Sequence, residues 1–216
     1  MRAHPFEIEG EKLILLAHKA IFWPSRKALL LADLHLGKVQ HFRKAGIGVP
    51  EQADQNLVRL EVLFQEYPPR EVYFLGDLFH SVWNQALSPF AQWLQKRPEV
   101  RFHLIQGNHD ILPTRKLLEM GLHLHTLPLD LGPFRMSHEP ISNREDRYNL
   151  AGHIHPGVLL RGAARQRLTL PCFYFGARGG LLPAFGSFTG LSRIKVKSGD
   201  RVFALSGDEI WPPQPA

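Results

Sequence analysis

The sequence predicts an α/β protein built from two packed mixed β-sheets flanked by helices. Three short apolar runs end in polar residues and indicate buried strands, at residues 29–32, 72–75 and 102–105. Apolar positions at helical spacing lie between these strands, at residues 51–66 and 85–96. Because strand, helix and strand alternate, we expect parallel crossover connections in the first sheet.

The chain changes character after about residue 121. Short apolar runs broken by glycine and proline follow, at residues 134–137, 148–151, 193–196 and 202–205. This pattern predicts strands in hairpins, which would form the second sheet. No internal repeat and no long linker interrupts the sequence, so we expect one domain over residues 1–216.

The composition restricts the class of protein and the kinds of partner. At 44% hydrophobic and 21% charged residues, the chain is typical of soluble globular proteins without a membrane partner, and the N-terminus lacks a secretory signal, which predicts a cytoplasmic location. Cys172 is the only cysteine, so a metal site must use His, Asp, Glu or Asn. The formal net charge of +6 favours an anionic partner such as DNA, although a merely solvated basic surface is the alternative. The oligomeric state is left open.

Side chains that commonly bind metals recur five times beside predicted strand ends. The motifs are Asp33-x-His35, Gly76-Asp77, Gly107-Asn108-His109-Asp110, Ser137-His138 and Gly152-His153-Ile154-His155. Ligands at positions i and i+2 of an extended segment project to the same side, so each Asp/His or His/His pair can converge. Oxygen and imidazole ligands without thiolate suit Mn, Fe, Zn or Ni, in pairs about 3.5–4 Å apart. A single Asp or His is more often a cap or a packed residue, but five motifs together outweigh that interpretation.

The ordered series of motifs, across residues 29–156, is similar to the calcineurin-like metallophosphoesterase superfamily. The resemblance implies two divalent metal ions, most consistently Mn, that activate a hydroxide for phosphate ester hydrolysis. The ligands would be Asp33, His35 and His155 for one metal, Asn108, His138 and His153 for the other, and Asp77 as the bridge. His109 would contact the phosphate, and Asp110 would orient His109.

A narrower resemblance, over residues 29–208, is to the ligase-associated DNA damage response endonuclease family. It rests on residues 33–38, 42–46, 76–81, 138–140 and 182–190. It implies a bacterial phosphodiesterase that acts on DNA during repair, with a repair ligase or helicase as a partner protein.

Five further residues are candidates for substrate contacts. Lys38 and Arg43, together with Lys44, follow the first motif and can receive a phosphodiester backbone, although a solvated helix face is the alternative. His80 follows Asp77 and can reach the phosphate, or it can simply pack. Arg178 lies in a glycine-rich stretch that can clamp phosphate, or it can be an ordinary surface arginine.

Two other functions compete with the nuclease interpretation. One is a small-molecule phosphoesterase, such as the related hydrolase of a nucleotide-linked lipid, which typically carries Arg where this chain has His109. That hydrolase also needs an apolar lid, and no such insertion is visible. The other is a non-catalytic interaction scaffold, which the complete set of ligands disfavours.

Overall fold

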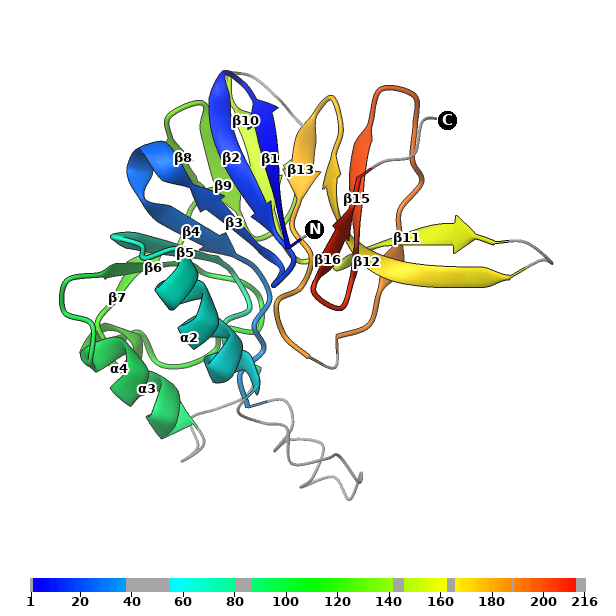
Figure 1. Cartoon of the computed structure of the whole chain (residues 1–216). Helices are drawn as coiled ribbons and strands as arrows, with labels where there is room; N and C mark the ends of the chain where they lie inside the picture. Colours follow the sequence, from blue (N-terminus) through cyan, green and yellow to red (C-terminus); the bar gives the residue numbers. More distant parts are fainter. Residues whose placement is uncertain are drawn as a thin grey trace.

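The computed structural model describes residues 2–37, 55–80, 87–141, 146–162, 166–187 and 189–212. Two mixed sheets pack against each other, and the helices cover the outer face of the first sheet (Figure 1). The α/β class with two packed mixed sheets is therefore confirmed.

The first sheet contains seven strands among the described residues. In spatial order they are β1 (Ala3–Ile8), β2 (Glu11–Leu16), β3 (Ala20–Trp23), β4 (Ala28–Leu31), β5 (Glu71–Leu75), β6 (Arg101–Ile105) and β7 (Leu122–His125). Strands β1 to β4 pair antiparallel, and β4 to β7 pair parallel. The parallel half is the part that the alternation of strands and helices predicts. The antiparallel strands before residue 28 were not predicted.

The second sheet contains nine strands among the described residues. Seven follow one another as β14 (Ser192–Arg193), β11 (Pro156–Arg161), β12 (Arg167–Phe175), β13 (Gly179–Leu181), β10 (Tyr148–Ala151), β9 (Phe134–Ser137) and β8 (Leu129–Leu131). The other two are β15 (Arg201–Ser206), which pairs with β12, and β16 (Glu209–Trp211), which pairs with β15.

Two predictions about the second sheet were wrong in detail. Strands β9 and β10 do not form a hairpin but pair parallel, with Tyr148 opposite Phe134 and Ala151 opposite Ser137. Their carboxyl ends consequently meet, which matters for the site. The strand expected at residues 193–196 is short, since β14 ends at Arg193.

Two apolar layers hold the molecule together. The helical elements are η1 (Pro24–Arg26), α2 (Gln55–Glu66), α3 (Ser88–Gln95) and α4 (Thr114–Glu119). One layer lies between the helices and the first sheet and includes Leu60, Leu63 and Phe90. The other lies between the two sheets and includes Trp23 and Phe134, whose rings meet edge to face. Burial of these side chains on both faces fixes the first sheet, whose strand ends carry the site.

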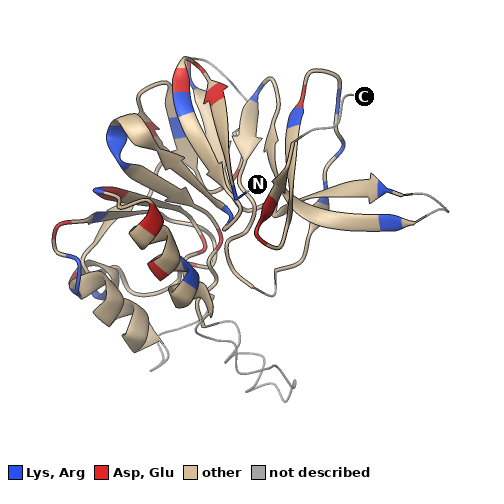
Figure 2. Cartoon of the chain, in the orientation of Figure 1, with Lys and Arg blue, Asp and Glu red and all other residues tan. Residues whose placement is uncertain are grey.

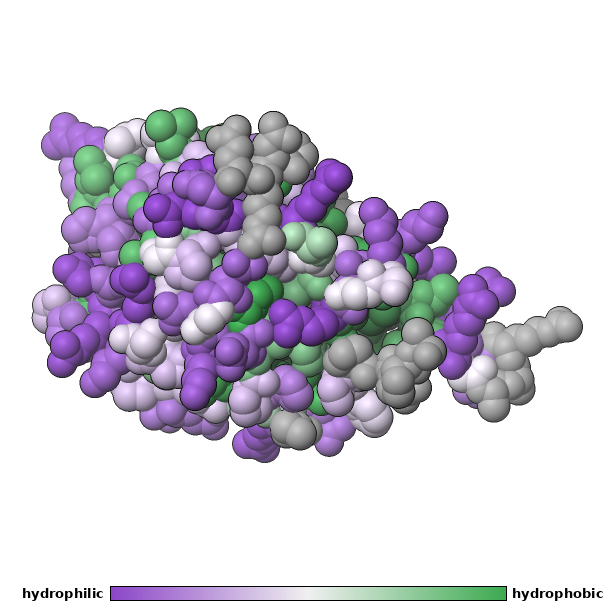
Figure 3. Space-filling model, turned by 90° about the horizontal axis from the view of Figure 1, so that it is seen from above, coloured by the Kyte–Doolittle hydropathy of each residue, from purple (hydrophilic) through white to green (hydrophobic). Residues whose placement is uncertain are grey.

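The surface is largely polar. Acidic residues lie mainly over the first sheet and its helices, whereas β11 and β12 show only basic ones (Figure 2). Seen from above, hydrophobic residues appear as separate patches among hydrophilic ones (Figure 3). None of the helices in the described ranges is long and apolar enough to cross a membrane.

Cys172 is buried, and burial raises the pKa of its thiol to about 12, so this cysteine is a poor nucleophile.

Three histidines lie side by side on β6 and β7. His103 is directly opposite His123, and its Nδ1 lies 3.1 Å from Nε2 of His125. Burial first, and then the charges of His125 and His123, lower the pKa of His103 to about 4. Between about pH 6.5 and pH 4, an unfolded chain therefore binds a proton that the folded chain rejects.

We expect the free energy of unfolding to fall as the pH drops through this window, and His103→Gln to flatten the decline. Urea unfolding at pH 7 and at pH 4.5 measures it. His18→Gln, which changes a histidine outside the cluster, is the matched control and should leave the slope unchanged. If the free energy of unfolding of His103→Gln falls with pH as steeply as that of the wild type, His103 does not cause the decline.

Candidate metal centre

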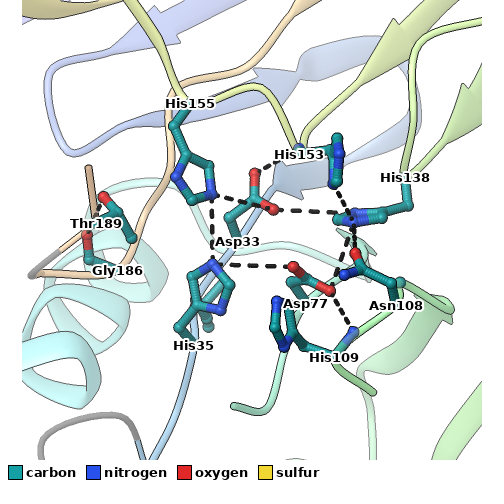
Figure 4. A network of polar contacts seen from close by, with 12 residues as sticks. Asp33, His35, Asp77, Asn108, His109, His138, His153, His155, Gly186 and Thr189 are labelled. Carbon is teal, nitrogen blue, oxygen red and sulfur yellow. Dashed lines mark hydrogen bonds and ion pairs between the residues drawn. The ribbon is translucent and has the colours of Figure 1, made fainter. Parts of the chain in front are cut away.

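The polar motifs meet because they follow parallel strands. Asp33, Asp77 and Asn108 come shortly after β4, β5 and β6, whose carboxyl ends lie at one edge of the first sheet. His138 and His153 come after β9 and β10, whose carboxyl ends lie together in the second sheet. The two edges face each other, and the side chains converge between them (Figure 4).

The first group of ligands consists of Asp33, His35 and His155, whose ligand atoms all lie within 4.8 Å of one another. Nε2 of His155 lies 3.3 Å from Nε2 of His35 and 3.6 Å from Oδ1 of Asp33. Among the described residues, buried Oδ1 of Asp33 has no hydrogen-bond donor. An unsatisfied buried carboxylate oxygen beside two imidazole nitrogens is the arrangement that a cation would satisfy.

The second group consists of Asp77, His138 and His153, which also lie within 4.8 Å of one another. Nε2 of His138 lies 3.0 Å from Nδ1 of His153, 2.9 Å from Oδ1 of Asn108 and 3.4 Å from Oδ1 of Asp77. A single ring nitrogen carries at most one proton, so these contacts cannot all be hydrogen bonds. The donor atoms therefore also fit a cation.

Asp77 lies between the two groups. Its Oδ1 is on the side of His138, and its Oδ2 lies 3.9 Å from Nε2 of His35. The side chain is almost completely buried, and Oδ1 also accepts a hydrogen bond of 2.9 Å from the backbone N–H of His109. One carboxylate thus presents an oxygen to each group, which is the geometry that a bridging ligand requires.

Backbone carbonyls orient two of the imidazoles. Nδ1 of His138 lies 3.2 Å from the carbonyl of Leu75, and Nδ1 of His155 lies 3.2 Å from the carbonyl of Gly190. Carbonyls only accept, so Nδ1 is the donor in each ring, and the lone pair is left on Nε2, which faces the ligand group. The contribution of Gly190 was not predicted, although the residue lies in the segment 182–190 that supports the narrower resemblance.

The ligands converge through an unusual backbone conformation. Residues Asp33, His35, Asp77, His153 and His155 all have positive φ angles, between 48° and 65°. The prediction that the i and i+2 pairs lie on extended segments was therefore wrong. Asp33 and His35 do converge on one ligand group, whereas His153 and His155 belong to different groups. Left-handed conformations at residues other than glycine cost about 1–3 kcal/mol each and persist where the surroundings enforce them. Hydrogen bonds from Asp33 N to Gly76 O (3.2 Å) and from His35 N to Asp77 O (2.9 Å) provide that constraint.

Glycines leave room for the ligands. A Cβ atom on Gly76 would lie 2.1 Å from Nδ1 of His138, and one on Gly107 would lie 2.4 Å from Oδ1 of Asp77. A Cβ on Gly152 would lie 2.7 Å from Oδ2 of Asp33. Gly186, whose role was not predicted, would meet the carbonyl of Leu34 at 2.5 Å. Each distance is too short for a real side chain, so the site requires glycine at these positions.

Gly76→Ala should destabilise the fold by at least about 3 kcal/mol and impair the second ligand group, because it adds a steric overlap to left-handed strain. Gly121→Ala is the matched control, since Gly121 has a comparable φ of 89° against 77° but nothing within 4 Å of its Cβ position. This control should cost only about 1–2 kcal/mol. Urea unfolding and elemental analysis measure both effects, and equal losses in the two variants would contradict the steric argument.

His109 and His80 lie at the side of the first ligand group. The His109 ring is 5.7 Å from the ring of His35 and 5.1 Å from that of His80, measured between centroids. Asp110 is buried, and in the described part of the chain its oxygens accept hydrogen bonds from the backbone of Phe79 (3.0 Å) and Gly107 (2.9 Å). Asp110 thus links the segment that follows Asp77 to the segment that contains Asn108. Its side chain has no such bond to the His109 ring. Burial raises the pKa of Asp110 to about 7, against the opposing effect of those two donors.

The remaining candidates for substrate contacts do not reach the site or fall outside the described residues. Arg178 is exposed and precedes β13, where Gly179 pairs with Asn149. Since His153 follows the other end of β10, the register places Arg178 away from the ligands, and a clamp by this arginine is not supported. Lys38, Arg43 and Lys44 lie outside the described ranges.

Comparisons with known proteins agree with this geometry. The calcineurin-like phosphoesterase family matches residues 26–211, which contain both ligand groups. The structure is similar to the crystal structure of Pseudomonas putida nuclease MPE, with a TM-score of 0.82 and 33% sequence identity over 98% of this chain and 100% of that chain. No curated protein matches the sequence. The chain therefore belongs to the calcineurin-like phosphoesterase family, and it is a metal-dependent phosphoesterase with a dinuclear metal centre.

Proposed function

We propose that the protein is a nuclease, a phosphodiesterase that hydrolyses DNA at this metal centre. The observation that carries the proposal is the pair of ligand groups joined through Asp77, with the His109 ring beside them. When bound, two divalent ions would activate water as the nucleophile and neutralise the charge of the phosphate. His109 would then contact the phosphate or protonate the leaving oxygen.

The burial of the ligands supports a polymeric substrate. Asp33 and Asp77 lie at the base of the site and are buried, whereas His109 is half-buried and Asn108 is exposed. The site therefore opens to solvent on the side of residues 108–109. A long phosphodiester strand can approach such an open face, whereas a small ligand is usually held in an enclosed pocket.

The proposed metal is Mn, with Fe, Zn or Ni as alternatives. Carboxylate, imidazole and amide donors without thiolate suit all four ions, and the oxygen donors of Asp33, Asp77 and Asn108 are of the kind that Mn prefers. Adding each ion to chelated protein and measuring hydrolysis identifies the ion used in vitro. Activity with Mn well below that with another ion would overturn this choice.

Two observations favour nucleic acid over other phosphate esters. The similar protein from Pseudomonas putida is described as a nuclease, and its likeness extends over the whole chain. His109 stands where the related hydrolase of nucleotide-linked lipids typically has Arg, which disfavours that alternative. A role in DNA repair, beside a ligase or helicase, rests on the narrower sequence resemblance.

The proposal is tested by incubating purified protein and Mn with three substrates: circular single-stranded DNA, a linear duplex and an aryl phosphodiester dye. We expect the dye and the circular strand to be cut. A circle has no ends, so its cleavage identifies an endonuclease. Hydrolysis of the dye without cleavage of any DNA would instead favour a small-molecule phosphodiesterase.

A further inference from the structure

The strongly basic part of the chain lies next to the metal centre. Residues 147–199 contain eight lysines and arginines and neither aspartate nor glutamate. Their formal charge of +8 exceeds the net charge of +6 of the whole chain. This segment includes the ligands His153 and His155 and the hairpin of β11 and β12, which begins at Pro156, directly after His155.

The hairpin projects from the body of the molecule (Figure 1), and only basic residues colour its two strands (Figure 2). Its outer end carries Arg161 and Arg167, which are exposed and directly opposite each other in the antiparallel register. Like charges in such a cross-strand pair repel each other. Within the described residues neither arginine has an acidic partner, so no acidic side chain of that part of the chain relieves the repulsion.

A third arginine lies on the same face, closer to the metal centre. Arg193 of β14 is exposed and pairs with Gly157 of β11 in parallel register. Side chains alternate along a strand, so residues 157, 159 and 161 share one face, and paired residues on neighbouring strands share it with them. Arg161, Arg167 and Arg193 therefore project from one face, which we call the arginine face.

The arginine face leads outward from a metal ligand. The backbone N–H of Ser192, beside Arg193, donates to the carbonyl of His155 at 3.0 Å. Arg161 lies at the far end of β11, about 17–20 Å along the strand from His155. One strand of a duplex advances about 3.4 Å per nucleotide, so this length corresponds to about five or six nucleotides.

We infer that the arginine face binds the sugar-phosphate backbone of the strand that is cut, about five nucleotides from the scissile phosphate. The inference rests on the proposed nuclease function. Guanidinium groups bind phosphate oxygens through two parallel hydrogen bonds, and phosphates between Arg161 and Arg167 would remove their mutual repulsion. Contacts of this kind position a strand without reading its sequence. Short substrates that end before Arg161 would not make these contacts.

The test compares Arg161→Gln/Arg167→Gln with the wild type on two substrates, a 30-nucleotide single strand and an aryl phosphodiester dye. For the long single strand, the logarithmic dependence of binding on salt should flatten by about 1.4, since each lost phosphate contact on a single strand removes about 0.7. Binding is measured with Ca in place of Mn to prevent cleavage. Hydrolysis of the dye should stay unchanged, because the dye cannot reach the outer arginines.

Control variants separate the alternatives. Arg2→Gln/Arg115→Gln removes the same charge from exposed arginines elsewhere and should keep the wild-type slope. Arg161→Lys/Arg167→Lys keeps the charge and should restore most of the slope. An unchanged slope in Arg161→Gln/Arg167→Gln, or an equal loss in the Arg2/Arg115 pair, would overturn the inference.

The opposite face of the hairpin carries the exposed pair Leu160 and Leu168. Weaker strand binding in Leu160→Ser/Leu168→Ser, with no effect of the arginine variant, would also overturn the inference and place the strand on the leucine face. If the wild type hydrolyses the dye but binds and cuts no nucleic acid, the proposed nuclease function itself fails. If the wild type cuts DNA but Arg161→Gln/Arg167→Gln binds the strand like the wild type, the role of the arginine face is refuted while the proposed nuclease function stands.

Discussion

Asp77→Ala should lose both metal ions and lower hydrolysis of a phosphodiester by at least about 10³-fold, since metal ions stabilise the charge of the transition state by several kcal/mol. The reason is position: Asp77 presents one oxygen toward His138 and the other toward His35. Elemental analysis of the dialysed protein measures the metal content, and the dye assay measures the rate.

The variant should remain folded, because its main structural loss is the hydrogen bond from the backbone of His109, worth about 1–3 kcal/mol if the donor is left buried. Asp77→Asn keeps an acceptor for that N–H and separates the loss of charge from the loss of the hydrogen bond. Asp208→Ala, which removes an exposed carboxylate, should leave metal content and rate unchanged. Two metal equivalents in folded Asp77→Ala would remove Asp77 from the bridging role.

His109→Ala should lower the rate by about 10²–10⁴-fold while both metal ions stay bound, because general acid catalysis and charge stabilisation typically contribute this much. The His109 ring lies beside that of His35 but belongs to neither ligand group. Steady-state hydrolysis and metal content of the same sample distinguish the two roles.

His123→Ala, an exposed histidine on β7, is the matched control and should behave like the wild type. Loss of one metal equivalent from His109→Ala would make His109 a ligand. A rate close to that of the wild type would leave it without a part in the reaction. His80→Ala, prepared in parallel, shows whether the neighbouring ring shares the role.

The sequence predicted the positions of the ligand motifs well because each one follows a short apolar strand. Asp33, Asp77 and Asn108 come after buried strands whose parallel pairing brings their carboxyl ends together. That relation depends only on hydrophobic patterning and topology, and both can be recognised from residue types.

Other features depend on contacts between distant segments, which local patterns do not contain. The parallel pairing of β9 and β10 could not be distinguished from a hairpin, because strand direction depends on the course of the intervening segment. The positive φ angles of Asp33 and His155 are enforced by tertiary contacts rather than by residue type. The same holds for Gly190, whose carbonyl reaches a histidine 35 residues earlier in the chain.

The central claim is that one chain binds two divalent ions through the two groups described here. Equilibrium dialysis of chelated protein against Mn, followed by elemental analysis, tests it most directly. We expect two equivalents per chain at saturation, with hydrolysis of the dye rising as the second ion binds. Saturation at one equivalent with full activity would contradict the dinuclear centre.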